Sequence, residues 1–127
     1  MIAIDTSSLI AYLRGDGGAD VELVDEAFRL QQAFLPPVVL TELLSLPGLE
    51  RSVAKLVREI PVLEADTGLW ERAAGTRRRI LSKKLRARLA DTLIAQSCLD
   101  YGVPLITRDS DFRHFAAHAG LKLVTRT

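Results

Sequence analysis

The chain is poor in the residues that bind zinc and in those that stack on nucleic-acid bases. Its 127 residues include one cysteine, Cys98, and two histidines, His114 and His118. A single cysteine excludes an intramolecular disulfide and is typical of a reducing cytosol. The histidine pair has no evident third ligand, so a zinc site is not expected. Four Phe, two Tyr and one Trp are few for recognition of single strands by stacking.

Long apolar runs and an excess of one charge are also missing. No apolar stretch approaches membrane-spanning length, and no basic region precedes an apolar one at the N-terminus, so no signal peptide is expected. The net charge of +1 indicates no partner by itself. Without a linker, internal repeat or low-complexity segment, the length predicts one globular domain over residues 1–127. We expect a cytoplasmic protein with no membrane association.

Short apolar, β-branched runs alternate along the chain with longer segments of helical periodicity. Strands are expected at 2–4, 33–35, 60–65, 104–107 and 121–125, and helices at 7–14, 20–32, 38–45, 49–59, 67–85 and 89–101. Ser7 or Ser8 is expected to cap the first helix. Pro37 suits the first turn of the third helix, and Gly102 and Pro104 stop the last. This alternation predicts an α/β three-layer sandwich with a mostly parallel central sheet of about five strands.

Four acidic residues, Asp5, Glu42, Asp91 and Asp109, lie inside or directly beside apolar runs. A carboxylate there is costly unless its charge is compensated. Sites in open parallel sheets form beyond the carboxyl ends of strands. Asp5 follows the first strand and Asp109 the fourth, while Asp91 begins the helix that leads into the fourth. Glu42 lies one turn into the helix after the second strand. We therefore expect all four side chains at one crevice.

Carboxylates gathered at one crevice cannot all stay ionised without a cation. Mg²⁺ accepts a few carboxylates and keeps several waters, and Mn²⁺ accepts the same ligands. Such an ion activates a water and offsets charge on the leaving oxygen of a phosphodiester. The pattern predicts a Mg²⁺ or Mn²⁺ site with Asp5, Asp91 and Asp109 as ligands and with Glu42 bound directly or through water. Helix capping explains a single acid such as Asp91, but it does not explain four.

Four segments together resemble the PIN-domain ribonucleases, and within them the VapC-type toxins of bacterial toxin–antitoxin pairs. They are IDTSSLI, PPVVLTELL, ADTLIAQ and GVPLITRDSDF, in this order over nearly the whole chain. The resemblance implies a PIN-like nuclease fold and a metal-dependent endoribonuclease. It also implies a cognate VapB-like antitoxin that holds the toxin inactive, and a two-fold homodimer.

The resemblance also implies roles for individual residues. The family's catalytic acids correspond to Asp5, Glu42, Asp91 and Asp109, and Asp111 matches an auxiliary position that is often acidic. Hydroxyl positions that steady the carboxylates or their waters correspond to Thr6, Ser7 and Thr107.

Basic residues are concentrated in segment 72–88, which contains no acid. Such a segment favours a track for the phosphate backbone of RNA, formed by Arg77, Arg78, Lys83 and Lys84. A solvated helix face or a patch for an acidic protein partner is the alternative. The position of the segment just ahead of Asp91 favours RNA.

Other functions fit the residues less well. A phosphoreceiver needs an acid pair at the first strand, a phosphoacceptor after the third and a lysine after the last. Glu64 lies at the end of the third expected strand with Asp66 directly after it, but Lys122 lies within the last strand rather than after it. A haloacid-type phosphatase needs a second Asp two positions after Asp5, where Ser7 stands. A housekeeping RNA-processing nuclease and a catalytically idle binding module remain alternatives, because a fold does not establish an activity.

Overall fold

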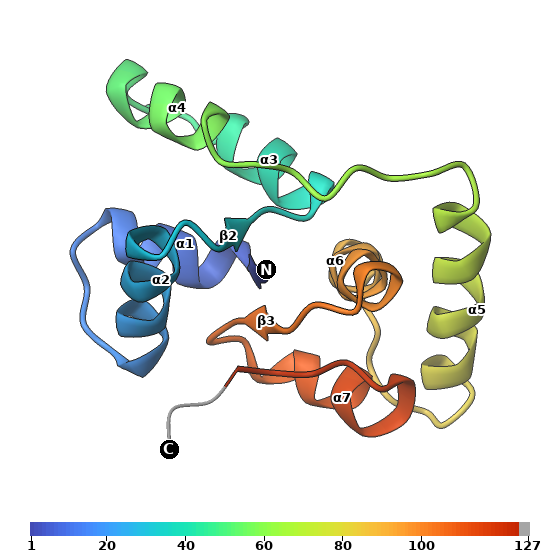
Figure 1. Ribbon diagram of the computed structural model, residues 1–127. Coiled ribbons are helices and arrows are strands. Elements are labelled where there is room, and N and C mark those ends of the chain that lie inside the picture. Colours follow the sequence, from blue (N-terminus) through green and yellow to red (C-terminus); the bar gives the residue numbers. More distant parts are fainter. Residues whose placement is uncertain (125–127) are drawn as a thin grey trace.

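The computed structural model describes residues 1–124 and shows short parallel strands flanked by helices (Figure 1). The strands are β1 (Ile2–Ile4), β2 (Ala33–Phe34) and β3 (Leu105–Ile106). The helices are α1 (Thr6–Leu13), α2 (Ala19–Arg29), α3 (Pro37–Leu44), α4 (Arg51–Arg58), α5 (Leu69–Leu81), α6 (Leu89–Tyr101), the 3-10 turn η1 (Ser110–Phe112) and α7 (Arg113–Ala119). No helix within residues 1–124 is both long and apolar enough to span a bilayer.

The sheet has the strand order β2-β1-β3, and both pairings are parallel. In β1, Ala3 lies opposite Phe34 of β2 and Leu105 of β3. Ala3 and Ile4 are fully buried, as expected for a central strand covered on both faces. Because all strands run the same way, their carboxyl ends lie along one edge, where the side chains that follow β1 and β3 meet.

The α/β class and the parallel sheet are confirmed, but the expected number of about five strands is wrong. Three strands form within residues 1–124. Segment 60–65 meets β2 only in an isolated bridge between Leu35 and Val62, and the last segment makes one between Leu105 and Leu123. Pro61 has no N–H to donate, which shortens pairing at that edge. Thr125, the end of the last expected strand, lies outside the described residues.

The helices differ from expectation mainly at their ends. Asp5, rather than Ser7 or Ser8, occupies the N-cap position of α1. Helix α5 is shorter than segment 67–85, and Lys84 beyond it has a φ of 60°. The sequence did not predict η1, which contains Asp111, or α7, which directly follows it. Their short length gives few turns of periodicity to detect.

Helix α6 lies between the strands and α5 (Figure 1). Six of its residues are buried, including Ile94, Ala95 and Cys98. Burial on several sides explains why its apolar positions show little periodicity. The left-handed Gly102 ends the helix as expected (φ 64°). This packing places the first turn of α6, which carries Asp91, against the carboxyl edge of the sheet.

Candidate active site

Asp5 is the buried centre of the carboxyl edge. It follows β1, and its backbone N–H donates to the carbonyl of Ile106 at the end of β3 (2.9 Å). Its Oδ2 accepts hydrogen bonds from the hydroxyls of Ser7 (2.6 Å) and Thr107 (2.8 Å). Burial nevertheless raises the pKa of Asp5 above its ordinary value, against the lowering effect of both hydroxyls. The two hydroxyls therefore hold one carboxylate oxygen in place in a poorly solvated position.

Three carboxylates gather beside it. Asp91 comes from the first turn of α6, and Asp109 and Asp111 come from the turn after β3. One oxygen from each lies within 4.8 Å of the others. The backbone N–H of Asp111 donates to Asp109 Oδ1 (2.9 Å), which closes the local turn. The resemblance assigned Asp111 an auxiliary position, but the structure groups it with Asp91 and Asp109 more tightly than Asp5.

The carboxylate of Asp91 is in an unfavourable electrostatic environment. Its pKa is raised to about 6, first by burial and then by the charges of Asp109 and Asp5, while Arg88 acts in the opposite direction. Its Oδ2 is buried, and no hydrogen-bond partner for it lies among residues 1–124. An unpartnered buried carboxylate oxygen is rare. A cation would satisfy this oxygen and relieve the repulsion.

Glu42 lies at the periphery of the acids. Its Oε1 accepts a hydrogen bond from the hydroxyl of Thr6 (2.8 Å), which ties α3 to the start of α1. Thr6 directly follows Asp5, so this hydrogen bond places Glu42 next to the site. Neither Glu42 nor Asp5 belongs to the group of three carboxylates, although the charge of Asp5 raises the pKa of Asp91.

The donor set suits a hard divalent cation. All three grouped donors are carboxylate oxygens, which is the chemistry that Mg²⁺ and Mn²⁺ prefer. Within residues 1–124, no histidine or cysteine joins such a group. Cys98 is fully buried in the core, and burial followed by the charge of Asp5 raises its pKa to about 12. It is therefore an unreactive core residue.

Arginines also lie near the acids, and they were not among the site residues predicted from the sequence. A guanidinium nitrogen of Arg86 lies 3.9 Å from the Asp111 carboxylate, and one of Arg113 lies 3.8 Å from it. Arg88 lowers the pKa of Asp91 through its charge. The loop after α5 therefore brings positive charge to the rim of the acidic site, which suits an anionic ligand.

The basic segment 72–88 does not form one continuous track. Arg72 pairs with Asp66 (2.6 Å) and Asp100 (2.7 Å). Arg77 is half-buried, and its Nε donates to the carbonyl of Ala87 (2.8 Å). The exposed cations in the segment include Arg78 on α5 and Lys83 and Lys84 in the loop that follows.

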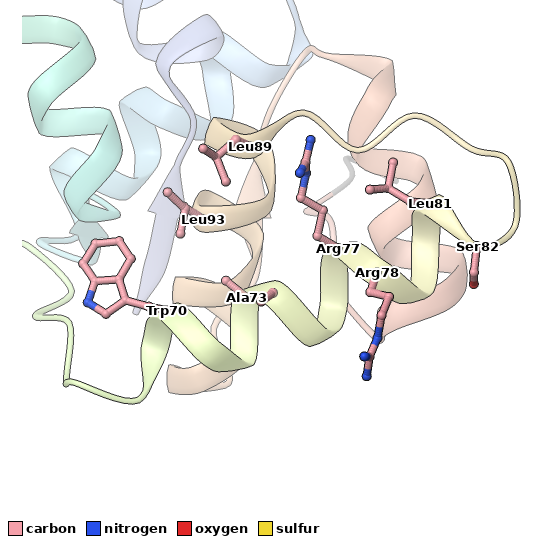
Figure 2. Close-up of a pocket in the computed structure, with 9 residues that line it drawn as sticks. Trp70, Ala73, Arg77, Arg78, Leu81, Ser82, Leu89 and Leu93 are labelled. Atoms are coloured by element: carbon pink, nitrogen blue, oxygen red, sulfur yellow. The ribbon is translucent and has the colours of Figure 1, made fainter.

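An apolar groove lies beside these cations, between α5 and α6 (Figure 2). Its volume is about 620 Å³. Figure 2 shows Leu89 and Leu93 of α6 facing Ala73 of α5, with Trp70 at one end of the groove and Ser82 at the other. Trp70 is 61% exposed and Leu89 is 60% exposed. Trp70 is therefore a surface residue, available for contact with another molecule.

Comparison with known proteins agrees with this architecture. The PIN domain family model matches residues 2–118. Among solved structures, FitAcB from Neisseria gonorrhoeae is similar with a TM-score of 0.72 and 21% identity over 98% of this chain and 97% of that chain. FitAB bound to the IR36 DNA fragment is similar with a TM-score of 0.73 and 17% identity, over 98% of this chain and 94% of that chain. VapBC2 from Rickettsia felis, bound to a DNA fragment from its promoter, is similar with a TM-score of 0.71 and 18% identity over 100% of both chains. No curated protein sequence matches the chain.

Proposed function

The chain belongs to the PIN domain family, and on that premise we propose that it is a Mg²⁺- or Mn²⁺-dependent endoribonuclease that hydrolyses RNA phosphodiesters. The observation that carries the proposal is the acidic group at the carboxyl edge of the sheet. It combines three carboxylates within 4.8 Å with a buried Asp91 oxygen that has no partner among residues 1–124. Stability alone does not explain such a group, because each additional charge raises its electrostatic cost.

In this proposal Asp5, Asp91 and Asp109 hold the cation, Glu42 binds it directly or through water, and Asp111 assists. A bound Mg²⁺ or Mn²⁺ supplies an activated water and neutralises charge on the phosphate. The protein holds the carboxylates in position through hydrogen bonds from hydroxyl groups. Ser7 and Thr107 donate to Asp5, and Thr6 donates to Glu42.

We further propose that the protein is a cytoplasmic toxin, that it forms a homodimer, and that a VapB-like antitoxin holds it inactive. The motif resemblance supports this assignment, as does the similarity to chains solved in FitAB and VapBC2 complexes. In the same proposal Arg77, Arg78, Lys83 and Lys84 contact RNA. The exposed positions of Arg78, Lys83 and Lys84 support phosphate contact, whereas the Nε of Arg77 is already occupied.

Cleavage of labelled RNA by the purified protein tests the activity. We expect cleavage with Mg²⁺ or Mn²⁺ and none in excess chelator. Asp91→Asn should lower the rate by more than about 100-fold, the upper range for residues that only support metal ligands. Asp100→Asn, on the same helix but outside the acidic group, is the matched control and should keep the activity. A folded Asp91→Asn protein that cleaves RNA at the wild-type rate contradicts the proposal.

Two other functions predict different results. A housekeeping RNA-processing nuclease would cleave RNA without arresting growth, and no neighbouring gene product would inhibit it. A catalytically idle binding module would leave RNA intact with either metal. Expression of the chain with and without the product of the adjacent reading frame distinguishes the first of these from a toxin.

A further inference from the structure

Arg108 lies between two residues of the proposed site but points away from it. On one side, Thr107 donates to Asp5 (2.8 Å). On the other, Asp109 belongs to the acidic group, and its N–H donates to Thr107 Oγ1 (3.0 Å). Arg108 is therefore joined through the backbone to two residues of the proposed site.

The Arg108 side chain is held by Asp20, near the start of α2. Its Nε and a terminal nitrogen donate to the two oxygens of Asp20 at 2.8 and 3.0 Å. The hydroxyl of the fully buried Ser8 donates to the same carboxylate (2.8 Å), and the carbonyl of Gly17 accepts a further bond from Arg108 (3.2 Å). Two parallel bonds between a guanidinium and a carboxylate fix orientation as well as distance.

The glycine-rich loop before α2 leaves room for this pair. Gly18 has a φ of 137°, which side-chain-bearing residues rarely adopt. A Cβ at this position would lie 2.8 Å from Asp20 Oδ1 and 3.2 Å from a terminal nitrogen of Arg108. The glycine at the N-cap of α2 therefore permits the close approach of the loop to both charged groups.

Strand pairing does not hold the segment that follows β3. The strand ends at Ile106, and the tethers of residues 107–109 include the Thr107 hydroxyl, the Arg108 pair and a long bond from the Arg108 N–H to Ser7 Oγ (3.4 Å). The guanidinium of Arg108 pairs with Asp20, 88 residues earlier in the chain, and so connects this segment to α2, outside the acidic group. The Arg108 side chain is 38% exposed and that of Asp20 is 14% exposed, and we expect such a partly exposed pair to contribute more to local position than to global stability.

We propose that Arg108 is a positioning residue, which, through its paired bonds to Asp20, fixes Thr107 against Asp5 and Asp109 within the cation site. This inference rests on the proposed metal site. It assigns a site-organising role to Arg108, Asp20 and Ser8, none of which contacts the acidic group through its own side chain.

Mn²⁺ affinity, measured by calorimetry on the full chain, tests the proposal. Arg108→Gln and Asp20→Asn should each weaken binding about tenfold, as supporting partners of metal ligands do. The double variant should be no weaker than either single variant, because both changes remove the same ion pair. Arg108→Lys should recover little, because an ammonium cannot form the paired bonds. Arg29→Gln, which breaks an exposed 4.0 Å pair on the same helix α2, is the control and should bind like the wild type.

Amide exchange, measured by NMR on the metal-free protein, separates this inference from the proposed function. The Asp109 and Asp111 amides should exchange several-fold faster in Arg108→Gln and Asp20→Asn, but not in Arg29→Gln. Faster exchange with about tenfold weaker Mn²⁺ binding supports the proposal. Unchanged exchange overturns it, and so does faster exchange with unchanged affinity. If the wild type binds no Mn²⁺, the proposed metal site is wrong, and Arg108 then has no cation ligand to position.

Discussion

At the scale of single residues, two aspartates on α6 face opposite electrostatic conditions. Asp91 sits among other acids, and its pKa is raised to about 6. Asp100 accepts bonds from Arg72 (3.0 and 2.7 Å) and Gln96 (2.9 Å), and Arg72 chiefly lowers its pKa. The same substitution at the two positions should therefore change stability in opposite directions.

We predict that Asp91→Asn stabilises the metal-free protein at pH 7. Because the folded pKa lies above the ordinary value of 3.8, the favourable contribution of the protonated group is present below pH 4 and is lost as the pH rises through about 6. Removing the charge should raise the free energy of unfolding by about 1–2 kcal/mol, allowing for partial solvent screening. Urea unfolding measures this, with Asp100→Asn as the control that should lower stability. Destabilisation by Asp91→Asn contradicts the electrostatic assignment.

The raised pKa of Asp91 also predicts how metal binding depends on pH. Below about pH 6, a proton must leave this carboxyl before a cation binds. The Kd for Mn²⁺ should therefore rise with falling pH, by about tenfold per unit if one proton is displaced. Titrations between pH 5 and 8 measure this. A Kd that stays constant from pH 7 to 5 excludes Asp91 as a ligand.

At the scale of elements, a polar contact joins α5 to α6 inside the protein. The buried Thr76 hydroxyl donates to Gln96 Oε1 (2.5 Å), and Gln96 in turn donates to Asp100 (2.9 Å). The network joins α5 to the later turns of α6, whose first turn carries Asp91. Gln96 and Asp100 lie on the side of α6 that contacts Thr76 and Arg72 of α5.

We predict that Thr76→Val costs about 1–3 kcal/mol of unfolding free energy, because it leaves the buried oxygen of Gln96 without a donor at nearly constant volume. Thermal and urea unfolding measure the loss. Thr41→Val, at an exposed position of α3, is the control and should change stability by less than about 0.5 kcal/mol. Equal effects at both positions would show that the buried hydrogen bond contributes nothing.

The basic residues of α5 and the loop after it carry a separate prediction. Replacing Arg78, Lys83 and Lys84 with Gln should weaken RNA binding across sequences, and the log–log salt slope should fall by about 0.7 for each phosphate that these side chains no longer neutralise. Arg77→Gln, tested alone, should have a smaller effect on the slope because its Nε is bound to Ala87. Cleavage of bound RNA should survive in the triple variant. Unchanged RNA binding with loss of antitoxin binding would identify a protein-docking face instead.

At the scale of the whole molecule, several large apolar side chains remain exposed around one groove. Trp70, Leu81 and Leu89 all line the space between α5 and α6. Clustered apolar surface of this kind is unusual for a monomer. The cluster supports the proposed two-fold homodimer, in which the same patch on each copy is covered by the other.

We predict a dimer in sedimentation equilibrium at micromolar concentration. Leu89→Glu should shift the protein to a 14.0 kDa monomer without unfolding it, because the substituted side chain is already solvated. Leu30→Glu, at an exposed position after α2, is the control and should leave the dimer intact. A wild-type protein that sediments only as a monomer contradicts the assembly.

The sequence by itself determined the α/β class, the parallel sheet and the approximate positions of the longer helices. These follow from periodicity, which is a local property of the chain. The acids at the ends of β1 and β3 were also predictable, because parallel strands bring their carboxyl ends to one edge. The roles assigned to these acids stay proposals.

Only the tertiary structure decided which side chains meet. Within residues 1–124 it limited the sheet to three strands, grouped Asp111 with Asp91 and Asp109, and tied Arg77 to Ala87. The pairing of Arg108 with Asp20 spans 88 residues and left no periodic signal. Such pairings depend on loop paths and on side-chain directions between distant segments, and neither is set by local propensity. For this reason the convergence of the acids at one edge of the sheet was predictable from the sequence, while the interactions that hold them there were not.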